Sequence, residues 1–197
     1  MPTQPTSVEF DNVQVLALLR QVAGRDERAF ARLYESVSRR VFAFAMHRLR
    51  DPVAAGEIVS ETLYEVWRSP TAFRGDAKFS TWLLGIARHK LLDRLRSRGP
   101  EHEDIDEYHD ELPSIAPDGF ATLALQQRRD GVLACLDRLV DPHRECLYLV
   151  FYESLSLAEI AGLQGVPENT VKTRLFHARA KIKQCLQSML AREGGHG

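Results

Sequence analysis

Residues 155–179 read LSLAEIAGLQGVPENTVKTRLFHAR, and this stretch decides the fold because it predicts two short helices joined by a tight turn. Ser156 precedes an apolar run and Glu159 follows three residues later, a capping box that marks the start of a helix. Gly165 lies where the turn needs a residue that tolerates a positive φ. Pro167 suits the first turn of the second helix, since its missing N–H would have no partner there. Together these signals predict a helix-turn-helix.

The second helix of this motif has one apolar face and one polar face. Val171 and Leu175 are spaced i, i+4, so they are expected to pack on the first helix. The opposite face carries groups that read base edges and hold phosphates, namely Asn169, Lys172, Thr173, Phe176 and His177. No Asp or Glu occurs between Glu168 and Glu193, whereas several Lys and Arg do. The pattern favours DNA binding over an ordinary helical hairpin with a solvated basic face.

The chain as a whole is predicted to be all-α, with two small helical domains joined by an acidic flexible linker. No segment shows the sustained period-two alternation of a strand. The apolar periodicity predicts helices over residues 11–23, 26–49, 52–67, 80–98, 121–140, 143–152, 156–163 and 167–190. We place the first domain at 10–98, the linker at 99–120 and the helix-turn-helix domain at 121–192.

The net charge of −1 hides an uneven distribution. Residues 99–120 contain eight of the 27 acidic residues and no Lys or Arg, so 19 acidic and 26 basic residues remain elsewhere. Two mildly basic bodies are therefore joined by an acidic strap, which DNA phosphates would repel. The strap is expected either to lie on a basic protein surface or to act as a solvated tether.

The three cysteines are Cys135, Cys146 and Cys185, an odd number at wide spacing. They form no recognisable disulfide framework, so we expect buried free thiols and a reducing, cytoplasmic compartment. His143 and Cys146 have a ligand-like spacing, but a zinc site needs about four ligands and no second pair is evident. No metal and no cofactor is expected. No segment is apolar and long enough to predict a secretion signal or membrane insertion.

A second group of interest lies in the predicted fourth helix and the loop before it. Aromatic side chains alternate there with cations, a pattern that suits unstacked bases and their phosphates. The residues are Phe73, Arg74, Lys78, Phe79, Trp82, Arg88 and His89, with further cations at Lys90, Arg94, Arg96 and Arg98. Phe73 and Phe79 are expected to be partly exposed, because Gly75 and polar residues surround them. For Trp82, a place in the core is an equal alternative.

With this second group, the chain resembles the extracytoplasmic-function (ECF) group of bacterial sigma factors. The matching runs are DERAFARLYE (26–35), EIVSETLYEVW (57–67), FRGDAKFSTWLLGIARHKLLDRLR (73–96) and the helix-turn-helix. They follow the family's order over roughly four-fifths of the chain. The resemblance implies a promoter-recognition subunit that has no catalytic residues of its own. Its partners would be core RNA polymerase, through the β′ clamp helices and the β subunit, promoter DNA in duplex and melted form, and an anti-sigma factor.

The resemblance also implies roles for individual residues. Glu57, Ser60 and Glu61 would contact the polymerase. The loop from Phe73 to Phe79 and the start of the next helix would melt and hold the minus-ten element. The face that includes Lys172, Thr173, Phe176 and His177 would read the minus-thirty-five element, with Arg174 and Arg179 towards the DNA backbone.

Three positions depart from the family's usual pattern. His89 stands where an asparagine often contacts the flipped base, Ser60 replaces a glutamine, and Gly56–Glu57 replaces an acidic pair. These departures bear on the base preference and on the individual polymerase contacts rather than on the general role.

Two rival functions remain at this stage. Two-domain transcription regulators carry a similar helix-turn-helix, but their other domain is usually α/β, whereas the N-terminal half here is helical and basic. A nucleic-acid enzyme would need paired carboxylates with a histidine, a metal cluster or a phosphate-binding glycine loop, and none is evident.

Overall fold

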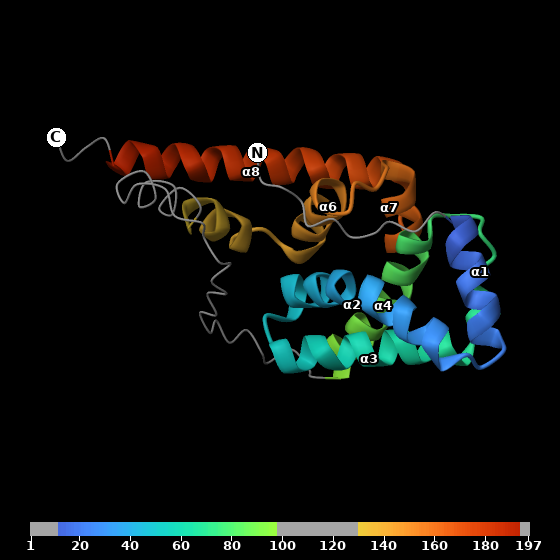
Figure 1. The fold of residues 1–197 in the computed structure, drawn as a ribbon. Coiled ribbons are helices and arrows are strands. Elements are labelled where there is room, and N and C mark those ends of the chain that lie inside the picture. Colours follow the sequence, from blue (N-terminus) through green and yellow to red (C-terminus); the bar gives the residue numbers. More distant parts are fainter. Residues whose placement is uncertain (1–11, 98–129, 194–197) are drawn as a thin grey trace, which may run out of the picture. The chain divides into compact units, whose positions relative to one another are not determined.

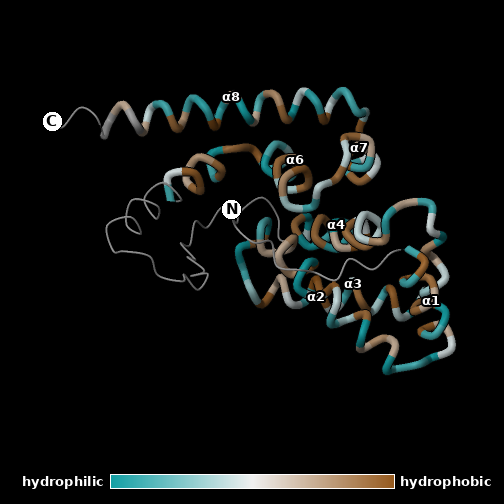
Figure 2. The backbone as a smooth tube through the Cα atoms, turned by 45° about the horizontal axis from the view of Figure 1, so that its top comes forward, coloured by the Kyte–Doolittle hydropathy of each residue, from teal (hydrophilic) through white to brown (hydrophobic). Residues whose placement is uncertain are grey.

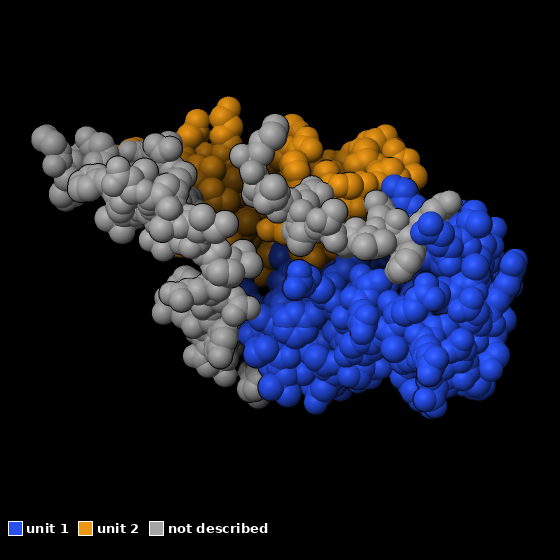
Figure 3. Space-filling view, in the orientation of Figure 1, with its two compact units in different colours: residues 1–107 blue, residues 108–197 orange. Residues whose placement is uncertain are grey.

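The computed structural model describes residues 12–97 and 130–193, and these are helices joined by short turns, with no strand among them (Figure 1). The chain divides into two compact units, residues 1–107 and 108–197 (Figure 3). The all-α prediction with two helical units is therefore confirmed. Residues 1–9, whose two prolines predict a loose segment, and the predicted acidic linker at 99–120 lie outside the described residues, so the proposed domain limits stay a prediction.

The described part of unit 1, residues 12–97, contains four α-helices and a short 3-10 helix, and aspartates begin two of them. Asp26 accepts hydrogen bonds from the N–H groups of Arg28 and Ala29, and Asp51 does the same for Val53 and Ala54. Each carboxylate satisfies amides that the first helical turn leaves without a partner. The elements are α1 (Asn12–Ala23), α2 (Glu27–Leu49), α3 (Pro52–Arg68), η1 (Pro70–Ala72) and α4 (Phe79–Ser97).

The core of unit 1 forms where these helices present their apolar faces to one another. α2 packs on α1, α3 and α4, and α3 packs on α4. The apolar spacing of α2 predicts a buried face of Phe30, Leu33, Val37, Val41, Phe44 and Ala45. All of these are buried except Phe30, whose ring lies edge-on to Trp67 at 5.0 Å between centroids. The fully buried large side chains of this unit are Val15, Val22, Leu33, Val41, Ile58, Leu63, Val66, Leu83 and Leu84.

Unit 2 contains a helical segment at 130–137, followed by α6 (Asp141–Phe151), α7 (Leu157–Gln164) and α8 (Glu168–Glu193). α6 and α7 both pack on α8, and apolar residues recur along the α8 trace in Figure 2. Val171, Leu175 and Ala178 of α8 are buried as predicted. The apolar spacing of this helix also predicts burial of Ile182 and Leu186, but these side chains are only half-buried, because they line an open apolar groove with Leu147 and Phe151 of α6.

The cysteines of unit 2 correct the expectation of three free thiols. Cys135 and Cys185 form a disulfide that joins the 130–137 segment to α8 across a sequence separation of 50 residues, with 5.8 Å between their Cα atoms. Cys146 alone is free, and it is buried. Wide spacing predicts free thiols, but helices bring distant residues together at positions that cysteine spacing does not encode.

Candidate nucleic-acid interface

The turn of the helix-turn-helix has the geometry that its sequence predicts. The Ser156 hydroxyl accepts from the Glu159 N–H at 3.3 Å, and Glu159 Oε2 accepts from the Ser156 N–H at 2.8 Å, which completes the capping box. Gly165 ends α7 with φ of 66°, a left-handed conformation that a side chain would strain. The turn therefore fixes where α8 begins relative to α7.

The polar face of α8 is exposed at six of the seven predicted DNA-binding positions: Asn169, Lys172, Thr173, Phe176, His177 and Arg179. Phe176 is 70% exposed, which is unusual for so large an apolar side chain. Lys172 Nζ lies 3.0 Å from Glu168 Oε1 one turn earlier, and the Thr173 hydroxyl donates to the Asn169 carbonyl. The contacts of these two side chains stay within α8, so the face is available to a duplex groove.

Arg174 differs from the other predicted contacts because it points into the unit. Its Nη1 donates to Gln164 Oε1 at 2.7 Å, and Gln164 Nε2 donates to Glu145 Oε2 at 2.9 Å. The Cys146 thiol donates to the same Gln164 oxygen at 3.4 Å, and burial raises the pKa of that thiol. The network joins α6, α7 and α8. Sequence reasoning missed it, because the partners of Arg174 stand 10 or more residues away.

Two histidines meet at the edge of this face. The rings of His143 on α6 and His177 on α8 stack, with 6.2 Å between centroids and 15° between planes. Burial lowers the pKa of His143, and the nearby charges of Lys181, His177 and Arg174 lower it further. The pKa of His143 thus lies below its usual range, and its ring stacks on the exposed ring of His177.

The aromatic residues of unit 1 are not arranged as expected. Phe73 and Phe79 are only 4% and 6% exposed, so the prediction that they are partly exposed is wrong. Their rings pack on each other at 5.3 Å and on Trp82 at 5.3 and 5.7 Å. The polar neighbours in sequence face outward, while the phenyl rings turn inward to remove apolar surface from water. Trp82 is half-buried and is the most accessible ring of the three.

The cations around this cluster are accessible. Arg74, Lys78 and His89 are exposed, and Arg88 is half-buried. His89, which replaces the family's usual asparagine, lies with Nε2 3.4 Å from Asp93 Oδ2 one turn later. The loop and the first half of α4 therefore present cations outward around a buried aromatic centre.

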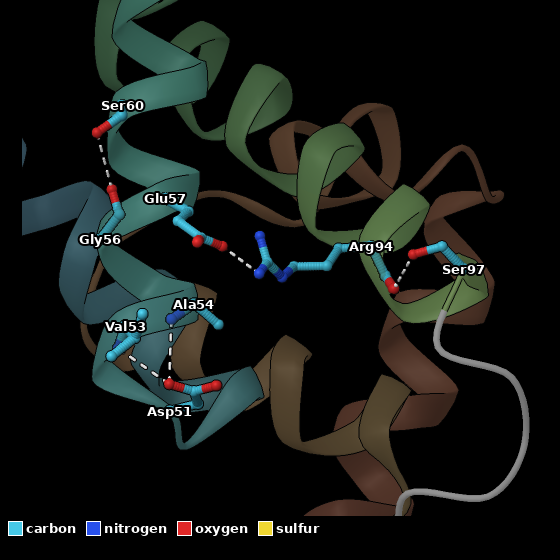
Figure 4. Close-up of polar contacts among 8 residues, drawn as sticks. All are labelled: Asp51, Val53, Ala54, Gly56, Glu57, Ser60, Arg94 and Ser97. Carbon is cyan, nitrogen blue, oxygen red and sulfur yellow. Dashed lines mark hydrogen bonds and ion pairs between the residues drawn. The ribbon is translucent and has the colours of Figure 1, made fainter.

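The three predicted polymerase contacts lie on the outer face of α3, where Figure 4 shows Glu57 and Ser60. Glu57 forms an ion pair with Arg94 of α4, and the Ser60 hydroxyl donates to the Gly56 carbonyl at 3.1 Å. Glu61 is exposed beside them. The same face continues with Val53 and Tyr64, which are 71% and 63% exposed and were not predicted. Their spacing of 53, 57, 60, 61 and 64 follows one side of a helix and could have identified them.

Comparison with known families places these elements. The model for Sigma-70 region 2 matches residues 33–101, and that for Sigma-70 region 4 matches residues 129–182. The ECF RNA polymerase sigma factor SigK of Mycobacterium tuberculosis (strain ATCC 25618 / H37Rv) is 34% identical over 173 residues, or 86% of this chain and 92% of that relative. The chain belongs to the ECF RNA polymerase sigma factors.

Solved structures agree with this assignment. The sigma factor RpoE of Bartonella quintana, in complex with the anti-sigma factor NepR, superposes with a TM-score of 0.60 at 26% identity, covering 80% of this chain and 96% of that one. CnrH, in complex with the cytosolic domain of CnrY, shares the fold at a TM-score of 0.58 and 24% identity, covering 90% and 99% of the two chains.

As a member of this family, the chain is an alternative sigma factor that binds core RNA polymerase and promoter DNA and directs promoter-specific transcription initiation. The rival reading as a separate two-domain regulator is not favoured. Sigma factors are typically non-enzymatic initiation factors. Within residues 12–97 and 130–193, no helix is long and apolar enough to cross a membrane.

Proposed function

We propose that the exposed face of α8 reads the minus-thirty-five element, that the loop before α4 and the start of α4 hold the melted minus-ten element, and that the outer face of α3 binds the polymerase clamp. The assignment of α8 to the minus-thirty-five element has the strongest support. It is supported by six exposed residues on one side of α8 and by a helix that has no acidic residue between Glu168 and Glu193. A duplex groove needs such a face.

The same proposal extends to the organisation of the chain and its partners. Residues 10–98 would form the polymerase-binding and melting domain, 99–120 the linker, and 121–192 the minus-thirty-five reader. The chain would act in the cytoplasm without catalysis of its own, because its partners, polymerase and promoter, are there. An anti-sigma factor is a further partner, supported by the complex of the similar RpoE with NepR.

Lys172→Ala and His177→Ala test the α8 assignment in reconstituted holoenzyme on a promoter found by transcription profiling. Each should weaken use of the minus-thirty-five element by about 1–3 kcal/mol if the side chain contacts a base. Lys183→Ala is a matched control, since it removes an exposed cation from the same helix roughly 16 Å further along. Wild-type transcription by both folded variants, with native discrimination against a mutated upstream element, would overturn the assignment.

A further inference from the structure

We propose that Asn12, at the first turn of α1, is a positioning residue that holds the loop before α4 in the shape that accepts the unpaired promoter strand. The inference rests on the proposed function of that loop. It goes beyond the match to Sigma-70 region 2, which begins only at residue 33 and so excludes α1.

The Asn12 side chain uses both ends of its amide on the loop. Its Nδ2 donates to the Ala77 carbonyl at 2.8 Å, and its Oδ1 accepts from the Phe79 N–H at 3.1 Å. These partners stand 65 and 67 residues away in sequence. An aspartate or a leucine could not make both bonds, because the first lacks the donor and the second lacks both groups.

The start of α4 needs a capping acceptor from elsewhere. Lys78 occupies the capping position, since its carbonyl accepts the first helical bond, from the Trp82 N–H at 3.1 Å. A lysine side chain has only donors, so it cannot satisfy the amides of the first turn. Asn12 supplies that acceptor from α1, which makes the first turn of α4 depend on a helix far away in the chain.

A second contact ties α1 to the same loop. Gly75 has φ of +86°, and a Cβ at this position would lie 3.3 Å from Leu16 Cδ1. Asn12 and Leu16 are one turn apart on α1 and so share a face. α1 also packs on η1, where the loop begins. The loop is thus anchored at both ends and at its glycine.

The anchored segment carries the exposed cations Arg74 and Lys78, and the buried Phe73 and Phe79 lie next to them. Since the phenyl rings are buried, the loop can present a fixed arrangement of cations only if its backbone is held. The two Asn12 bonds hold it at Ala77 and Phe79, on either side of Lys78. A loop that is already held in its binding shape loses less conformational entropy when the unpaired strand binds, so binding is stronger.

The test uses the full chain assembled with core polymerase. The DNA is a fork-junction probe, which has an upstream duplex followed downstream by an unpaired minus-ten strand. Asn12→Ala should bind this probe about fivefold more weakly, the effect of losing a helix cap. Its binding to a duplex carrying only the upstream element should not change. Val13→Ala is the control, since Val13 is the next residue on α1 and is 71% exposed.

Two further measurements separate positioning from a merely structural role. Trypsin should cleave Asn12→Ala faster after Arg74 and Lys78 while sites in α2 and α3 keep their wild-type rates; acceleration at all sites would overturn the inference. Asn12→Asp keeps the acceptor for the Phe79 N–H but lacks the donor for Ala77, so it should lose less thermal stability than Asn12→Ala and still bind the fork probe weakly. If Asn12→Ala unfolds unit 1, the aspartate variant decides.

The outcomes distinguish the function of the loop from the positioning role of Asn12. Wild-type holoenzyme that fails to bind the fork probe would overturn the proposed function of the loop, and this inference with it. Wild-type holoenzyme that binds the probe, alongside Asn12→Ala and Asn12→Asp variants that bind it equally well, would overturn the positioning role alone.

Discussion

The two proposed DNA-binding regions are built in different ways. In unit 2, six of the residues that would meet the duplex project from one side of a single helix, and its Lys172 and Thr173 side chains make contacts within α8. In unit 1, the region around the minus-ten loop is assembled from α1, the loop and α4, through contacts such as those of Asn12. The first region is local in sequence, and the second is not.

This difference decides what an aromatic residue means in each place. Phe176 on α8 is 70% exposed, whereas Phe79 at the start of α4 is 6% exposed and lies in a cluster with Phe73 and Trp82. Both residues stand among cations in the sequence. Only the tertiary packing shows that one is free to meet a base and the other supports the fold.

The largest expected effect comes from replacing the aromatic residues, which tests this difference between the two regions directly. Phe79→Ala should destabilise unit 1 by about 3–5 kcal/mol, because it removes a buried ring and leaves a cavity. Phe176→Ala should change stability by no more than about 0.5 kcal/mol and instead weaken binding to the upstream element. Thermal unfolding followed by tryptophan fluorescence checks the first variant, since Trp67 and Trp82 both lie in unit 1.

The contrast between a buried Phe79 and an exposed Phe176 would be wrong if Phe79→Ala impaired DNA handling and Phe176→Ala lowered stability. Unchanged stability in Phe79→Ala, together with loss of promoter melting detected by permanganate, would mean that the ring leaves the cluster to stack on an unpaired base. Phe79→Leu serves as the control for ring loss, since it keeps most of the buried volume and should lie between wild type and alanine.

The second-largest expected effect concerns the disulfide. This bond is confined to unit 2, because all three cysteines lie in that unit. Reducing Cys135–Cys185 should lower the unfolding free energy of unit 2 by about 2–4 kcal/mol, since the bond closes a loop of 50 residues in the unfolded chain. Circular dichroism, which reports both units, should show an earlier transition in reductant. Tryptophan fluorescence, which reports unit 1, should not shift.

The double variant Cys135→Ser/Cys185→Ser provides the control for the reductant itself. It should unfold at the same temperature with and without reductant and match the reduced wild type. An equal shift of the fluorescence transition in reductant would contradict the confinement of this bond's effect to unit 2.

Sequence reasoning succeeded where each signal is local. Ser156 and Glu159 of the capping box are three positions apart, Val171 and Leu175 are four apart, and the positive φ at Gly165 follows from the glycine itself. The limits of the helices that the structure describes in full were also close, because prolines and caps mark them, whereas most of the predicted helix at 121–140 lies outside the described residues.

Two of the misses have partners far along the chain: the disulfide spans 50 residues and the Asn12 bonds span 65 and 67. The third, the inward turn of Phe73, depends on packing against the nearby Phe79 and Trp82. No periodicity encodes these pairings. Composition around the loop pointed to exposure, but burial of the two rings outweighed their polar neighbours.

The smallest expected effect concerns the outer face of α3, where the same contrast between local and distant partners recurs. On α8, Lys172 pairs with a residue of its own helix, whereas Glu57 on α3 pairs with Arg94 on α4 (Figure 4). The Glu57 side chain is 50% exposed, so the pair contributes less than about 1 kcal/mol to stability. Glu57 could therefore serve the fold, the polymerase, or both.

Charge reversal separates these roles. Glu57→Arg should lose the small stabilisation and also bind core polymerase more weakly, and the exchange Glu57→Arg/Arg94→Glu should restore stability, because it restores the attraction between the helices. If Glu57 contacts the polymerase directly, the exchanged pair should still bind weakly, since a cation now stands where the partner surface meets a carboxylate. Glu61→Arg, on the same exposed face, should also weaken binding to core polymerase. Adding Arg94→Glu to this variant should not improve its stability. Full recovery of polymerase binding by the exchanged pair would instead assign Glu57 to the α3–α4 contact and leave Ser60 and Glu61, with Val53 and Tyr64, as the proposed docking face.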